Sequence, residues 1–127
     1  MAKEKFTIDY PMKSVPVALL WNYISSPNGL EQWFADEVQH SGKSYTFLWS
    51  GSGQDATLLS TRTGVYIRFR WNEDTDHSYF ELRIQVSELT DTTALIVTDF
   101  AEPDEIDEMK DLWDSQIETL QRVLGCL

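Results

Sequence analysis

The sequence predicts an α+β fold in which a curved antiparallel sheet of about six to seven strands packs on a long C-terminal helix. Two observations predict it. Short stretches between residues 38 and 100 alternate apolar and polar side chains, which is the period of half-buried strands. Residues 106–124 place apolar side chains three and four positions apart, which is the period of an amphipathic helix. A sheet and a helix that each have one apolar face must cover each other, and the 127 residues are expected to form one such domain, spanning 1–127.

Prolines mark the first strand and the first short helix. The stretch KFTIDY, residues 5–10, alternates apolar and polar residues, and Pro11 closes it. Ser14 is the expected N-cap of a short helix, with Pro16 in the first turn, where the missing N–H costs no hydrogen bond. Pro27 ends this helix because the residue before a proline avoids the helical conformation. The strand side chains expected to face inward are Phe6, Ile8 and Tyr10.

A second short helix is expected directly after the first. Asn28 and Gly29 favour a turn, and Leu30, Trp33 and Phe34 follow at helical spacing. These two helices are expected to pack against the rest of the protein. They are not expected to read DNA, because the chain has 21 acidic and 10 basic residues.

Short polar turns join the strands in the middle of the chain, which predicts an antiparallel sheet with one buried face. The stretch VYIRFRW, residues 65–71, has the clearest alternation, and YFELRIQV, residues 79–86, repeats it. SYTFLW, residues 44–49, precedes a hairpin turn at 50–53, and TALIVTDF, residues 93–100, ends the series. The side chains expected to face inward are Tyr45, Phe47, Trp49, Val65, Ile67, Phe69, Trp71, Phe80, Leu82, Ile84 and Val86. Those expected to face outward are Tyr66, Arg68, Arg70, Tyr79, Glu81, Arg83 and Gln85.

The last element is a helix of roughly twenty residues with a continuous apolar stripe. Asp104, Glu105 and Asp107 lie at its N-terminus, where the helix dipole favours negative charge. The stripe consists of Ile106, Met109, Trp113, Ile117, Leu120 and Leu124.

The formal net charge of −11 excludes some classes of partner. Phosphate backbones and anionic membrane surfaces repel so acidic a chain, so neither nucleic acid nor a membrane is an expected partner. Eight of the carboxylates lie in the segment 102–118, with one lysine. This acidic segment is interpreted either as a solvated helix face or as a docking surface for a basic protein partner.

The single cysteine, Cys126, permits no disulfide within the chain, which indicates a reducing, cytoplasmic location. Cys126 is expected to be a thiol at a frayed helix end. The first thirteen residues, MAKEKFTIDYPMK, contain no uninterrupted apolar run. They therefore predict neither a secretory signal nor a membrane span.

The sequence contains no convincing catalytic or metal-binding motif. His40 and His77 fall at a strand end and in a polar turn, and they are expected at the surface. No cysteine and histidine occur at metal-ligand spacing, so neither a metal nor a cofactor is expected. Asp99 is the one carboxylate whose face the pattern does not decide. If it faces inward, it would be a buried acid with a raised pKa and the first candidate for acid–base chemistry. Tyr45, or an arginine assigned here to the outer face, is the other candidate.

The order of these elements resembles the helix-grip fold of the START-like (SRPBCC, or Bet v 1-like) superfamily. The resemblance rests on residues 6–36, FTIDYPMKSVPVALLWNYISSPNGLEQWFAD, on FRW at 69–71 and on WDSQIETLQRVL at 113–124. The most similar branch is the one named after the activator of the heat-shock chaperone ATPase. The resemblance implies a cavity between the curved sheet and the C-terminal helix, closed at one end by the two short helices that carry Trp33 and Phe34. Members of the superfamily use this cavity for lipids, sterols, polyketides or hormones, and some are enzymes.

The inward aromatic side chains have two interpretations, a filled core or the lining of a cavity, and the pattern does not separate them. Three functions stay open: a non-catalytic binding module for a small apolar or amphipathic molecule, a protein-interaction module that is chaperone-linked or self-associating, and a cyclase-like enzyme. Either a monomer or a homodimer is compatible with the sequence. The candidate lining residues are Trp33, Phe34, Phe47, Trp49, Ile67, Phe69, Trp71, Phe80, Leu82, Trp113, Ile117 and Leu120.

Overall fold

Seven strands form one sheet, and every neighbouring pair in it is antiparallel. The computed structural model describes residues 2–126. In chain order its elements are β1 (Glu4–Pro11), α1 (Val17–Ser25), α2 (Pro27–Leu30), β2 (Glu37–Ser41), β3 (Ser44–Trp49), β4 (Ser52–Arg62), β5 (Tyr66–Trp71), β6 (Phe80–Ser87), β7 (Thr92–Ala101), the 3-10 turn η1 (Pro103–Glu105) and α3 (Ile106–Leu124). The helix-grip α+β fold expected from the sequence is therefore confirmed.

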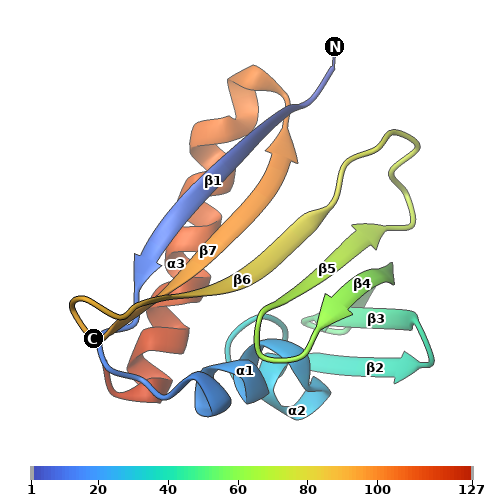
Figure 1. The fold of residues 1–127 in the computed structure, drawn as a ribbon. Coiled ribbons are helices and arrows are strands. Elements are labelled where there is room, and N and C mark those ends of the chain that lie inside the picture. Colours follow the sequence, from blue (N-terminus) through green and yellow to red (C-terminus); the bar gives the residue numbers. More distant parts are fainter. Residues whose placement is uncertain (1, 127) are drawn as a thin grey trace.

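The strand order β1-β7-β6-β5-β4-β3-β2 puts the first strand beside the last. The pair α1–α2 carries the chain from β1 at one edge of the sheet to β2 at the other (Figure 1). Helix α3 lies along the face of the sheet formed by β1, β7 and β6, while α1 and α2 lie at one end, near β2 and β3 (Figure 1). The sheet therefore curves around one long helix and is closed at one end by two short ones.

The core lies between the inner face of the sheet and the apolar stripe of α3. Trp113, Ile117 and Leu120 are the buried residues of that helix. On the sheet, Phe47, Phe69 and Leu82 are fully covered, and the expected alternation of β5 and β6 is confirmed up to Ile84. Burying each of these large apolar side chains contributes about 1.5–3 kcal/mol, so the stripe holds α3 against the sheet.

The expected N-cap of the first helix is wrong. Helix α1 begins at Val17, and Pro16 occupies its N-cap position with an extended backbone and no side-chain cap. Ser14 lies further upstream because Met12 and Lys13 continue the backbone pairing with β7, and residues 12–15 form a turn before the helix. The N–H of Met12 donates to the carbonyl of Thr93 at 2.8 Å, and the N–H of Thr93 donates to the carbonyl of Lys13 at 2.7 Å.

The second short helix begins earlier than the spacing predicted. Helix α2 covers Pro27–Leu30, so Asn28 and Gly29 are helical, and Trp33 and Phe34 lie in the turn that follows. The cause is a cap: the Ser26 hydroxyl accepts from the Gly29 N–H at 2.9 Å, and a proline at the first helical position is already shaped for the helix. Pro27 therefore ends one helix and begins the next.

Two side chains have a different exposure from that expected. Val86 is 48% exposed although it continues the inward alternation of β6, because it lies beside the exposed hairpin at 88–91. Cys126 is buried, not frayed. Gly125 adopts a left-handed conformation with φ 75° at the end of α3, and the Cys126 N–H donates to the carbonyl of Gln121 at 2.9 Å. This reversal turns the thiol towards the core.

The charged residues that were expected to face outward lie on the outer face of the sheet and form ion pairs there. Arg68 donates to the carboxylate of Glu81 at 2.7 Å, and Arg83 donates to the same carboxylate at 3.2 Å. Arg70 donates from Nε to the carbonyl of Ser78 at 3.0 Å. These arginines lie on the opposite side of the sheet from α3, so they cannot reach the interior.

Candidate functional site

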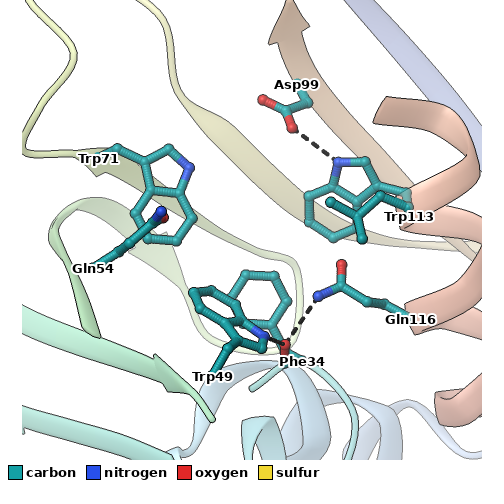
Figure 2. Close-up of a pocket in the computed structure, with 8 residues that line it drawn as sticks. Phe34, Trp49, Gln54, Trp71, Asp99, Trp113 and Gln116 are labelled. Atoms are coloured by element: carbon teal, nitrogen blue, oxygen red, sulfur yellow. Dashed lines mark hydrogen bonds between the residues drawn. The ribbon is translucent and has the colours of Figure 1, made fainter. Parts of the chain in front are cut away.

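A pocket of about 300 Å³ opens between α3 and the inner face of the sheet. Strands β3, β4, β5 and β7 each contribute one lining side chain, and α3 contributes three (Figure 2). Phe34, in the turn after α2, closes the end. The lining residues are Phe34, Trp49, Gln54, Trp71, Asp99, Leu112, Trp113 and Gln116.

Four of these residues form a continuous arc of aromatic rings. The ring centroid of Trp71 lies 6.1 Å from that of Trp49, Trp49 lies 5.6 Å from Phe34, and Phe34 lies 5.8 Å from Trp113. The arc joins two strands, a turn and the long helix, so it depends on the tertiary fold. We call these four rings the aromatic arc.

One backbone carbonyl fixes the middle of the aromatic arc. The indole N–H of Trp49 donates to the carbonyl oxygen of Phe34 at 2.8 Å. The amide nitrogen of Gln116 donates to the same oxygen at 2.9 Å, and both bonds are visible in Figure 2. These two hydrogen bonds restrain the side chains of Trp49 and Gln116 before any ligand arrives.

Asp99 lies at the far end of the arc, next to Trp113. It is 7% exposed and lies on the inner face of β7, the side that also carries Leu95 and Val97. Its carboxylate accepts from the indole N–H of Trp113 at 2.9 Å and from the N–H of Phe100 at 2.7 Å. Burial raises the pKa of Asp99 to about 6, against the opposing effect of these two hydrogen bonds. The face that the sequence left undecided is therefore the inner one.

The twelve candidate lining residues divide into three groups. Phe34, Trp49, Trp71 and Trp113 line the pocket, and Trp33 lines a neighbouring depression of about 370 Å³ beside it. The remaining candidates lie in the packed core and line neither space: Phe47, Ile67, Phe69, Phe80, Leu82, Ile117 and Leu120. The inner face is thus filled along most of its length and hollow at one end.

Sequence reasoning missed three lining residues, Gln54, Leu112 and Gln116. Gln116 follows Trp113 by three positions, so it lies on the same side of α3, and a polar residue there is a signal that could have been used. Gln54 lies two residues before the buried Ala56 and shares its face. Leu112 is 55% exposed and lies at the mouth of the pocket. It lies outside the apolar stripe of α3, so the sequence pattern gave no reason to place it in the lining.

The chemistry available in the pocket is limited to one acid and two amides. Among residues 2–126, the lining contains no arginine, lysine or histidine. His40 and His77 are exposed, as expected. The carboxylate oxygens of Glu102, Asp104 and Glu105 lie within 4.8 Å of one another before α3, outside the pocket and mostly exposed. An acid with a pKa of about 6 can exchange a proton near neutral pH, but it has no cationic partner in this lining.

Comparisons with known proteins agree with this architecture. A family model described as the START-like superfamily domain matches residues 1–126. The solution structure of BfR322 from Bacteroides fragilis is 41% identical, with a TM-score of 0.70 over 97% of this chain and 92% of that protein. The crystal structure of MLL2253 from Mesorhizobium loti is 18% identical, with a TM-score of 0.76 over 96% and 97% of the two chains.

A third solved structure is the Aha1 dimer from Colwellia psychrerythraea. It is 13% identical, with a TM-score of 0.75 over 98% of this chain and 96% of that one, and at this identity the likeness concerns the fold alone. No match was found among the curated proteins. Within residues 2–126, none of the helices is both long enough and apolar enough to cross a membrane.

Proposed function

The chain belongs to the START-like superfamily, and on this premise we propose that it is a binding module whose pocket beside α3 holds a small amphipathic molecule with a flat apolar part. The observation that supports the proposal is the aromatic arc around about 300 Å³ of open space. Binding sites for small molecules are mostly apolar concavities with a few well-placed polar groups. Asp99 and Gln116 supply such groups at one side of the arc.

The pocket is also prepared for binding before a ligand arrives. Trp49 and Gln116 are fixed by the Phe34 carbonyl, and Trp113 is fixed by Asp99. Ordering a rotamer-rich side chain on binding costs about 0.5–1.5 kcal/mol, and this cost is largely absent here. Tryptophans that only fill a core are expected to be fully buried. Trp49 and Trp71 are only half-buried, which favours a binding surface.

The proposal is tested with a neutral apolar fluorophore, N-phenyl-1-naphthylamine, whose emission rises in apolar surroundings. We expect saturable binding to the wild-type protein. Leu112→Trp places a large side chain at the pocket mouth, and because Leu112 is exposed, the substitution leaves the core intact. It should weaken binding at least several-fold. Val123→Trp is the matched control, since Val123 is a second exposed aliphatic residue of α3 and lies outside the lining.

Native mass spectrometry of freshly purified protein gives an independent measurement, because a bound molecule would add a defined mass. Fluorophore binding that is equal in wild type, Leu112→Trp and Val123→Trp would place the binding elsewhere. A wild-type protein that is recovered only in ligand-free form, and that binds no fluorophore, would contradict the proposal.

A second candidate function is a protein-interaction module, and the exposed surface of α3 favours it. The acidic segment 102–118 surrounds Leu112, an exposed leucine of that helix. An apolar contact within a negative field suits a basic partner, and salt should weaken such an association. Retention of the same proteins at low and at high salt in a pull-down would remove this electrostatic part. Sedimentation of the protein alone over a concentration series would separate monomer from homodimer.

A further inference from the structure

We propose that the molecule held by this pocket is an organic cation, such as a quaternary or aryl ammonium compound. The inference rests on the proposed function above and adds the charge class of the ligand. The geometry behind it is an arc of four aromatic rings with a carboxylate at one end and no cationic side chain in the lining among residues 2–126 (Figure 2).

Trp49 and Trp71 are the half-buried rings of the aromatic arc, while Phe34 and Trp113 are each 4% exposed and stack on one another behind them. The face of an aromatic ring carries negative potential and its edge carries positive potential, so ring faces attract cations. The indole N–H of Trp49 is bonded to the Phe34 carbonyl, and that of Trp113 is bonded to Asp99. The amide nitrogen of Gln116 is also bonded to the Phe34 carbonyl. These three donors are therefore already bonded within the protein, and the Trp71 indole and the Gln54 amide are the lining donors that make no hydrogen bond among residues 2–126.

The charges around the pocket favour the same class of ligand. Asp99 is the only charged residue of the lining among residues 2–126. The cation whose field reaches it is Lys3, which is paired with Asp74 at 3.0 Å and is not part of the lining. The net charge of −11 adds a long-range field that attracts cations and repels anions.

A cation would also remove an unfavourable feature of the empty pocket. Asp99 is ionised at neutral pH although burial raises its pKa to about 6. The groups that act on it are the Trp113 indole from α3, the Phe100 N–H from its own strand, and the charges of Lys3 and Asp74. A bound cation stabilises the ionised form, so its affinity should fall as pH decreases through about 6. Lys110 of α3 is not part of the lining. Its ammonium group lies over the ring of Phe6, the β1 residue that pairs with Asp99.

The experiment compares three probes of similar size by intrinsic tryptophan fluorescence and calorimetry at pH 7.5. Phenyltrimethylammonium is the cation, tert-butylbenzene is its neutral isostere, and benzoate is the anion. We expect the cation to bind about tenfold more tightly than the neutral isostere, since a desolvated cation–π contact together with a nearby carboxylate reaches this size. Benzoate should bind most weakly. At pH 5 the preference for the cation should shrink several-fold.

Three variants assign the preference to its residues. Asp99→Asn should reduce the affinity for the cation about tenfold and leave tert-butylbenzene nearly unchanged. Trp71→Leu removes one ring of the aromatic arc without removing any hydrogen bond seen in the structure, and it keeps the test decisive if Asp99→Asn does not fold. Tyr79→Leu is the matched control, because its ring lies under the Arg68 guanidinium on the outer face.

The outcomes separate the two proposals. Equal binding of cation and neutral isostere, or tighter binding of benzoate, would overturn the inference on charge and leave the binding module intact. A cation preference that survives both Asp99→Asn and Trp71→Leu would also overturn it, because the cation would then sit elsewhere. Failure of all three probes and of N-phenyl-1-naphthylamine would overturn both proposals.

Discussion

The stability of the Asp99→Asn variant relative to the wild-type protein should increase as pH rises from about 4 to about 7. The carboxyl group is 7% exposed and lies between the inner face of β7 and the Trp113 indole. Burial raises its pKa to about 6, whereas its ordinary value is 3.8. Between these two pH values the folded chain holds a proton that the unfolded chain has released. The contribution of Asp99 to the free energy of unfolding of the wild-type protein therefore falls in this interval.

The size of the effect follows from the difference of about two pH units between the folded and ordinary pKa values. Each unit corresponds to about 1.4 kcal/mol, so ionisation of Asp99 costs about 3 kcal/mol by pH 7. Asparagine cannot ionise, and it keeps an acceptor oxygen for the Trp113 or the Phe100 N–H. Loss of the other hydrogen bond adds an offset that does not depend on pH. The pH-dependent part of the difference thus belongs to the carboxylate.

Urea unfolding of the two proteins at pH 4, 5, 6, 7 and 8, followed by tryptophan fluorescence, measures this difference. The other carboxylates titrate in both proteins and cancel. We expect the difference in free energy of unfolding, variant minus wild type, to rise by about 2.5 kcal/mol between pH 4 and pH 8 and to level off above pH 7. Parallel curves would mean that solvent reaches Asp99. A difference that falls with rising pH would mean that the hydrogen bonds outweigh burial.

Three other substitutions or reactions test separate parts of the fold. Gly29→Ala should lower the free energy of unfolding by about 2 kcal/mol or more, because an added Cβ would lie 2.3 Å from the carbonyl oxygen of Asn22. An unchanged urea midpoint would refute this close approach. Glu81→Gln should lower the free energy of unfolding by about 1–3 kcal/mol, since the buried Glu81 carboxylate pairs with two arginines. If the exposed control Glu118→Gln lowers it as much, the outer-face ion pairs contribute little to stability. Cys126 should react with dithiobisnitrobenzoate at pH 8 much more slowly in the folded protein than in urea, because burial covers the sulfur and raises the pKa of the thiol. Equal reaction rates would show that the C-terminal turn is open.

Most of the architecture could be predicted because each element has a period that its sequence displays. The alternation in β5 and β6 and the stripe of α3 identify the inner faces, and both are confirmed. The errors fall where local signals compete with tertiary contacts. Ser14 is a good N-cap residue, yet the pairing of Met12 and Lys13 with β7 and the turn at 12–15 delay the helix. Val86 follows the alternation, but it lies beside the exposed hairpin at 88–91 and is itself exposed.

The candidate site was predictable only in part. Four aromatic residues of the arc were among the candidates, but so were seven that fill the core. A side chain that lines a hollow and one that fills a core have the same inward position in the pattern. Gln54 and Gln116 are the residues that distinguish the hollow end, because both place a polar side chain on an inner face that is otherwise mostly apolar.

The sequence by itself determined the order of the elements, their inner faces and the strongly negative charge, because periodicity and composition are local properties of the chain. Only the tertiary structure decided that the inner face is hollow at one end and that Asp99 lies there beside Trp113. These features depend on distances between residues far apart in the chain: β1 must pair with β7, and the turn after α2 must place Phe34 against α3. The curvature of the sheet sets those distances, and no local pattern encodes whether the remaining space is filled.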